Sequence, residues 1–239
     1  MSNESTRNMN RRSFIGATAA AAAASMAVAQ SARADEKPAG SVKILGIVGS
    51  MRKHKTTAQA MQIALDAAAA VSPAISVELI ELAGLNLDPY IAATKTKSVD
   101  KDDDFPALRA KLVAPEVGGV ILGSPVYMGI VSSPMKCLIE RLLDFRQNKY
   151  PLAGKVGGAL AVGGGRNTGV ELILQQLIMF MLSQSMVVVG EGPPTSHWGG
   201  TLWNHFGDDI SKDVDGLPTV KAIGKRVAET ALLIASAKK

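Results

Sequence analysis

The chain has 239 residues, 47% of them hydrophobic, and its 26 Lys and Arg against 21 Asp and Glu give a formal net charge of +5. Residues 1–34 hold four of these basic residues and one acidic residue, so the rest carries 22 against 20, and no basic face for nucleic acid is predicted. The single cysteine, Cys137, excludes an internal disulfide and any cysteine-ligated zinc or iron–sulfur site within one chain.

The first 34 residues resemble an export signal. A basic start with the pair Arg11-Arg12 precedes an apolar run over residues 14–29, and Ala32-Arg33-Ala34 gives a small-residue cleavage pattern. This pattern predicts a twin-arginine signal peptide over residues 1–34, a fold within residues 35–239 and a periplasmic location. The alternative is an uncleaved membrane anchor, although the apolar run is shorter than the ~20 residues that usually span a bilayer. We expect no stable membrane insertion after cleavage.

After this signal, apolar strand-like runs alternate with helical periodicity. Strands are predicted over residues 42–48, 75–82, 117–123, 155–162 and 186–189. Helices are predicted over residues 57–71, 105–113, 170–183 and 219–236, and a further helix starts with Ser133 as N-cap and Pro134 in its first turn. A long polar loop is expected over residues 83–104, and a loop rich in Gly and Pro after residue 189. The five strand–helix units predict one α/β domain with a doubly wound, five-stranded parallel sheet.

In such a sheet, ligands bind beyond the carboxyl ends of the strands, where three loops have unusual sequences. The first, over residues 49–57, joins a strand to a helix start, where backbone N–H groups and the helix dipole favour a phosphate. Its hydroxyl and cationic side chains belong to Ser50, Arg52, Lys53, Thr56 and Thr57. The same loop approximates a nucleoside-triphosphate P-loop, but His54 replaces the second glycine and no strand ends in an Asp for magnesium.

The second and third loops offer flat backbone surfaces. The second has the sequence GSPVYMG over residues 123–129, which can wall a planar heterocycle or form only a tight turn. The third, GGGRNTG over residues 163–169, would let a ligand ring lie against the backbone, or would be a flexible connection.

Together, the segments GSMRKHKTT, GSPVYMGIVSSPMKCLIERL and GGGRNTG resemble the flavodoxin-like NADPH-dependent FMN reductase family, in the branch that includes iron–sulfur flavoproteins. The resemblance covers about residues 41–190 and implies a flavodoxin-like fold with FMN as cofactor. It implies that the first loop binds the FMN phosphate. It also implies that the second and third loops lie along the flavin ring through Pro125, Val126, Tyr127, Met128, Gly129, Gly163, Gly164, Gly165 and Arg166. We expect Arg166 to stabilise the reduced, anionic flavin.

Two departures from the family pattern stand out. Lys55-Thr56 replaces the small residue and Asn that are common in the first loop. The family's cysteine cluster is absent from the loop after the second strand, where Asp88-Pro89-Tyr90-Ile91 stands instead.

Other features leave alternatives open. His197, Trp198, Trp203 and His205 could form a lid over the flavin or part of a subunit contact, with packing favoured over metal binding. Cys137 is expected to be a quiet, partly buried thiol. The helix over residues 170–183 is apolar nearly all round, so it should be deeply buried or shared with another copy in a homodimer or homotetramer.

The resemblance implies an FMN-dependent NAD(P)H oxidoreductase that passes electrons from a small donor to a small acceptor such as flavin or quinone. Export complicates this reading, because the periplasm is not expected to hold NADPH. The alternative is a non-catalytic flavodoxin-like electron carrier or binding module.

Overall fold

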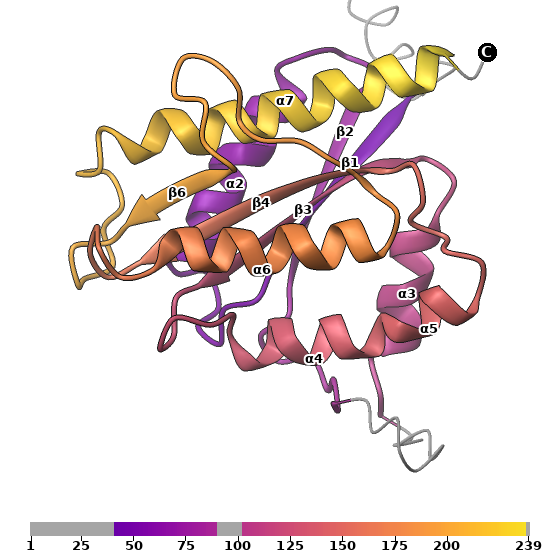
Figure 1. Ribbon diagram of the computed structural model, residues 1–239, viewed down its shortest axis with the longest axis horizontal. Helices are drawn as coiled ribbons and strands as arrows, with labels where there is room; N and C mark the ends of the chain where they lie inside the picture. The colour runs from indigo at the N-terminus through magenta and orange to yellow at the C-terminus, as the bar shows by residue number, and fades with distance from the viewer. Residues whose placement is uncertain (1–40, 90–101, 238–239) are drawn as a thin grey trace, which may run out of the picture. The chain divides into compact units, whose positions relative to one another are not determined.

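The computed structural model describes residues 41–89 and 102–237, which belong to one compact unit (Figure 1). The predicted signal peptide, and residues 90–101 of the long loop, lie outside the described residues. The sheet has strands β1 (Val42–Val48), β2 (Ile75–Glu81), β3 (Val117–Pro125), β4 (Val156–Gly163), β5 (Val187–Val188) and β6 (Gly200–Trp203). All pair in parallel, in the order β2-β1-β3-β4-β5, which confirms the predicted doubly wound sheet.

Two strands share the edge of the sheet next to β4. β5 pairs with the start of β4 at Val156 and Gly157, and β6 pairs with its end, from Leu160 to Gly163. The sequence predicted the first of these strands but treated β6 as loop. β6 matters for function because it carries the chain on to the carboxyl edge of the sheet.

The helices cover both faces of the sheet (Figure 1). Helices α2 (Thr56–Ala69) and α7 (Gly216–Ala237) lie on one face, and α3 (Phe105–Val113), α4 (Ser133–Arg141), α5 (Leu143–Gln147) and α6 (Val170–Ser183) lie on the other. Successive strand side chains point to opposite faces, so Leu45 packs toward α3, α4 and α6 while Ile44 packs toward α2 and α7. In the described residues, no helix is both long and apolar enough to cross a membrane.

The strand register brings the three predicted loops to one edge. Val48 at the end of β1 pairs with Gly123, and Pro125 at the end of β3 pairs with Val162. The three strands therefore end side by side, and the loops that follow them converge.

One helix start differs from the prediction. Ser132, not Ser133, holds the N-cap position of α4, and its side chain does not cap its own helix. Instead, the Ser132 hydroxyl donates a hydrogen bond to the carbonyl oxygen of Gly49 in the first loop. Ser132 thus joins two of the converging loops rather than capping its own helix.

Candidate functional site

A cleft of about 640 Å³ lies where the loops after β1, β3 and β4 meet. Its volume is within the roughly 300–1,000 Å³ of typical cofactor sites. Eleven of the fourteen predicted site residues line it, namely Ser50, Arg52, Thr56, Thr57, Pro125, Val126, Tyr127, Met128, Gly129, Gly163 and Gly164. The structure therefore brings most of the candidate residues together in one cavity.

The first loop presents the start of α2 to this cleft. The N-cap residue, Lys55, makes no side-chain cap hydrogen bond, and no acidic side chain lies in the first turn. Thr56 and Thr57 are buried in that turn and line the cleft. A helix start of this kind leaves backbone N–H groups free for an anion, and the helix dipole adds to the attraction.

Short contacts hold the first loop in shape. The buried Ser50 hydroxyl accepts a hydrogen bond from the backbone N–H of Arg52 at 3.0 Å. His54 adopts a left-handed backbone conformation, and its backbone N–H and ring Nδ1 both contact the Glu81 carboxylate, at 2.8 and 2.7 Å. Lys53, by contrast, is exposed and does not line the cleft.

The second loop is fixed by bonds from several directions. Tyr127 and Ile130 exchange two backbone hydrogen bonds across a turn that contains Met128 and Gly129, both in left-handed conformations. The side chain of Gln176 on α6 donates to the Gly129 carbonyl and accepts from the Val131 N–H, both at 3.1 Å. This turn forms a wall of the cleft with its apolar side chains exposed.

The third loop divides between two cavities. Gly163 and Gly164 line the cleft, whereas Gly165 and Arg166 line a second cavity of about 440 Å³ on the other side of the loop. Arg166 forms an ion pair with Asp215 at 2.8 Å, and its guanidinium lies 5.2 Å from the ring centre of Trp203. This placement gives no support to the expected contact between Arg166 and the flavin ring.

The predicted lid residues also divide. His197, Trp198 and Trp203 line the second cavity. The Glu191 carboxylate accepts one hydrogen bond from the His197 backbone N–H and contacts the His197 ring. His205 stacks on Trp203 with ring centres 3.8 Å apart. The residues of this segment that reach the cleft come after Trp203 in the chain.

Sequence reasoning missed one wall of the cleft, residues 204–208, which we call the strap. It contributes Asn204, Phe206, Gly207 and Asp208, and Val162 and Thr168 complete the lining. Because β6 runs parallel to β4, the strap continues along the third loop, and its backbone N–H groups at 204 and 206 donate to the carbonyls of Gly163 and Gly164 at 2.9 Å. The Phe206 ring packs so closely on Gly164 that a Cβ atom there would lie 2.7 Å from it.

The strap also reaches the cations of the first loop. The Asp208 carboxylate pairs through one oxygen with Arg52 at 2.7 Å and through the other with Lys55 at 2.9 Å. Hydrogen bonds from Lys55 and Arg52 lower the pKa of Asp208, so this carboxylate is ionised at neutral pH.

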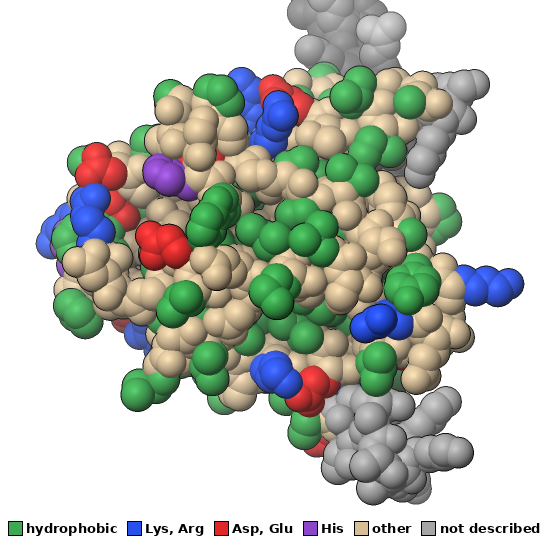
Figure 2. All heavy atoms as spheres, viewed as in Figure 1, with side chains coloured by type: hydrophobic (Ala, Val, Ile, Leu, Met, Phe, Trp, Pro, Cys, Tyr) green, Lys and Arg blue, Asp and Glu red, His purple; other side chains and the backbone are tan. Residues whose placement is uncertain are grey.

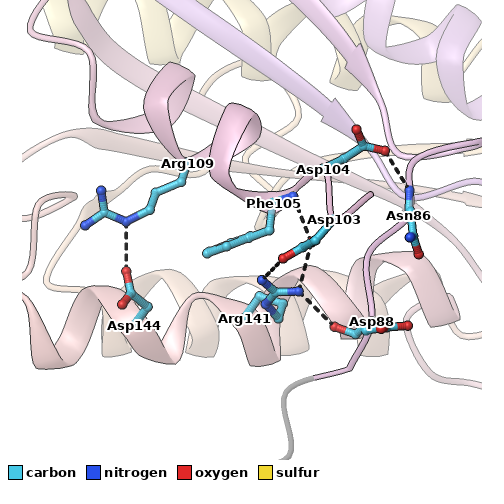
Figure 3. A network of polar contacts seen from close by, with 8 residues as sticks. All are labelled: Asn86, Asp88, Asp103, Asp104, Phe105, Arg109, Arg141 and Asp144. Atoms are coloured by element: carbon cyan, nitrogen blue, oxygen red, sulfur yellow. Dashed lines mark hydrogen bonds and ion pairs between the residues drawn. The ribbon is translucent and has the colours of Figure 1, made fainter. Parts of the chain in front are cut away.

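Figure 3 shows a polar network at the position where the family resemblance implies a cysteine cluster. Arg141 on α4 contacts the Asp103 carboxylate through both terminal nitrogens and reaches the backbone oxygen of Asp88 at 3.4 Å. Asn86 and Asp104 are joined by two hydrogen bonds, at 2.8 and 3.0 Å. Carboxylates and an arginine thus hold the two described ends of the loop after β2 together.

The same network holds α3 against α4 and α5. Arg109 pairs with Asp144 at 2.8 Å, and the Arg141 guanidinium lies 4.4 Å from the Phe105 ring centre. Burial alone would raise the pKa of Asp103, but hydrogen bonds from Arg141 and the Phe105 N–H outweigh it and lower that pKa.

One surface is more apolar than a single chain requires. Leu172, Met179 and Leu182 are at least half exposed on α6, and Met128 and Ile130 are exposed on the second loop. Figure 2 shows hydrophobic side chains on the face that carries α6. Of the two alternatives expected for this helix, deep burial does not hold in the single chain, because one side of α6 is uncovered, and sharing with another copy stays a prediction.

The residues that line the cleft fit FMN. The uncapped start of α2 with its buried hydroxyls suits a phosphate, and the exposed apolar second loop suits one face of a flat ring. On the opposite side, the Phe206 ring lies over Gly164 and the Thr168 hydroxyl lies against Gly163, so the third loop does not offer the bare backbone surface that its glycines predicted. The Asp208 carboxylate is the one cleft-lining group of the described chain that opposes an anion beside Arg52.

Comparison with known proteins agrees with this fit. A family model described as NADPH-dependent FMN reductase matches residues 42–198. An iron–sulfur flavoprotein of Methanocaldococcus jannaschii is 41% identical over 196 residues, 81% of this chain and 99% of that protein. An NAD(P)H dehydrogenase (quinone) of Archaeoglobus fulgidus is 30% identical over 113 residues, 47% of this chain and 58% of that protein.

The fold has matches among solved structures. A WrbA-like flavodoxin from Agrobacterium tumefaciens superposes with a TM-score of 0.55 at 20% identity, over 80% of this chain and 98% of that one. This likeness confirms the flavodoxin-like fold. With the sequence matches and the cleft, it leads to one conclusion: the chain belongs to the NADPH-dependent FMN reductase family, as a flavin-dependent oxidoreductase with FMN as its cofactor.

Proposed function

We propose that this chain transfers electrons from a reduced nicotinamide, NADH or NADPH, to a small acceptor such as a flavin or a quinone. The observation that carries the proposal is the cleft itself, in which a helix start able to hold a phosphate lies beside an exposed apolar turn. The family's description and the quinone-reducing relative support the choice of donor and acceptor. Bound FMN supplies hydride and single-electron transfer, and the protein supplies placement.

In this proposal, the cleft residues have distinct roles. The backbone N–H groups at the start of α2, with the hydroxyls of Thr56 and Thr57 and the guanidinium of Arg52, hold the phosphate. Pro125, Val126, Tyr127, Met128 and Gly129 lie along the ring on one side, and Gly163 and Gly164, with the Phe206 ring that rests on Gly164, face it on the other. Tyr127 and Met128 are 43% and 99% exposed, so the cleft is open where a small donor or acceptor must approach.

We further propose that the chain acts in the periplasm after export through the twin-arginine route. The support is the Arg11-Arg12 pair and the apolar run that follows it. Because export would separate the protein from cytoplasmic NADPH, a quinol is the second donor to test.

We also propose that the protein is a homodimer or homotetramer. Leu172, Met179 and Leu182 form an exposed apolar stripe on α6, and burying such a stripe against another copy is favourable. Sedimentation of the protein and of Met179→Glu tests this, since the charged variant should shift the assembly toward the single chain. A wild type that sediments as a single chain contradicts it.

Anaerobic reduction tests the electron-transfer proposal. Bleaching of the FMN absorbance by NADPH, NADH or a quinol, followed by recovery and steady turnover when a quinone is added, is the expected result. Bleaching only by a partner protein, with no turnover of quinone or free flavin, would contradict the proposal and favour the electron carrier.

A further inference from the structure

We propose that Asp208 is an internal competitor of the FMN phosphate, which must displace this carboxylate from Arg52 and Lys55 in order to bind fully. The inference rests on the proposed place of the phosphate at the first loop. It makes Asp208 a residue that sets how strongly the cleft prefers FMN over riboflavin, which has the same ring system and no phosphate.

The geometry that carries the proposal is the position of the Asp208 carboxylate at the start of α2, where the phosphate is proposed to bind. Its two oxygens take separate cations, Arg52 at 2.7 Å and Lys55 at 2.9 Å, and both cations come from the loop that leads into α2. Lys55 is the N-cap residue of α2, and Arg52 lines the cleft with Thr56 and Thr57. A phosphate at this helix start would draw on the same two cations, and it would lie close to a fixed negative charge while Asp208 stayed in place.

The strap is built so that it can be released. All three side chains in the ion pairs are between 44% and 49% exposed, and exposed pairs are weak and screened by salt. His205 and Phe206 both have left-handed backbone conformations, with φ of 52° and 56°, which disfavour L residues. The Phe206 ring is 84% exposed although it rests on Gly164, so few contacts hold it there.

The other contact between the strap and α2 is weak. Asn204 donates to the Thr56 hydroxyl at 3.4 Å, which is long for a hydrogen bond. The two Asp208 ion pairs are therefore the main polar link from the strap to the first loop in the described chain. A phosphate that took these cations would cut that link and free the strap to move away from the cleft.

The test compares two flavins on three variants. Asp208→Asn removes the competing charge, and Asp209→Asn is the matched control, because it makes the same change of net charge at the next residue, whose carboxylate contacts Ser211 and Lys212 instead. Thr57→Val removes a proposed phosphate ligand at nearly constant volume. Dissociation constants for FMN and for riboflavin are measured by flavin fluorescence on flavin-free protein at fixed salt.

We expect Asp208→Asn to bind FMN about tenfold more tightly, since exposed ion pairs are modest in strength. The dissociation constant for riboflavin should change by no more than about twofold, and Asp209→Asn should leave the dissociation constants of both flavins near the wild-type values. An unchanged or weaker FMN affinity in Asp208→Asn, or an equal gain for riboflavin or in Asp209→Asn, would overturn the proposal. If Thr57→Val weakens the binding of both flavins equally, or of neither, the proposed phosphate site fails instead. This outcome distinguishes a failure of the phosphate site from a failure of the Asp208 proposal.

Discussion

The Ser132→Ala variant should have a lower free energy of unfolding than the wild type, and its cleft should be less rigid. The Ser132 hydroxyl donates to the Gly49 carbonyl, and its backbone N–H donates to the Ser124 hydroxyl at 3.0 Å. Both serines are essentially inaccessible to water, at 1% and 0% exposure. The bond from the Ser132 hydroxyl ties the first loop of the cleft to the start of α4, and the bond to Ser124 holds the two ends of the segment that contains the second loop together.

The magnitude follows from burial. The alanine variant leaves the Gly49 carbonyl without its donor in a place that water does not reach, and such a loss costs about 1–3 kcal/mol. For a domain of this size, that corresponds to a fall in the melting temperature of roughly 2–12 °C.

Urea denaturation measures this cost directly. The midpoint should fall while the slope stays constant, because the surface exposed on unfolding is unchanged. Ser183→Ala is the matched control, since Ser183 is exposed at the end of α6 and its hydroxyl donates to the Phe180 carbonyl at 2.7 Å. That variant should remain within about 0.5 kcal/mol of wild type. If the two variants were equally stable, the reasoning about the Ser132 link would be refuted.

Three further predictions concern the scaffold. Gly224→Ala should lower the free energy of unfolding by about 1–3 kcal/mol in urea melts, because its Cβ would lie 1.9 Å from the Ala64 carbonyl oxygen. Helix propensity alone would predict a higher free energy of unfolding for the alanine variant. Asp103→Asn should cost about 1–3 kcal/mol at neutral pH. Since bonding to Arg141 lowers the pKa of Asp103 in the folded state, the cost should vanish as the pH falls through that lowered pKa, and a pH-independent cost would contradict this. Burial raises the pKa of the Cys137 thiol, so iodoacetamide should alkylate it slowly in the folded protein and quickly in urea.

The parts of the fold that the sequence predicted well are those with a strong local pattern. The helices over residues 105–113 and 170–183 match the structure at both ends, and the long strands match within one or two residues. In these segments, hydrophobic periodicity, proline and glycine all favour the same element. The convergence of three loops then follows from the topology rule for parallel sheets.

The missed parts depend on contacts far apart in the chain. β6 has only four residues, in a segment rich in glycine, and its pairing with β4 is what makes it a strand. Asp208 reads as an ordinary polar loop residue, and only the fold brings it to cations more than 150 positions away.

Arg166 illustrates the same limit in the third loop. A side chain at the tip of a glycine loop can turn to either side, and its partner Asp215, 49 positions later, decides the direction. The composition of α6 likewise predicted a helix that is deeply buried or shared with another copy, but it could not decide between the two, and the single chain leaves one stripe of the helix exposed.

The cleft at the carboxyl edge of the sheet is the proposed FMN site. The most direct test is the visible absorption spectrum of the protein after incubation with FMN and removal of free flavin by gel filtration. We expect oxidised flavin bands that correspond to about one FMN per chain, as one phosphate-holding helix start implies. A protein that stays colourless after this treatment would contradict the account.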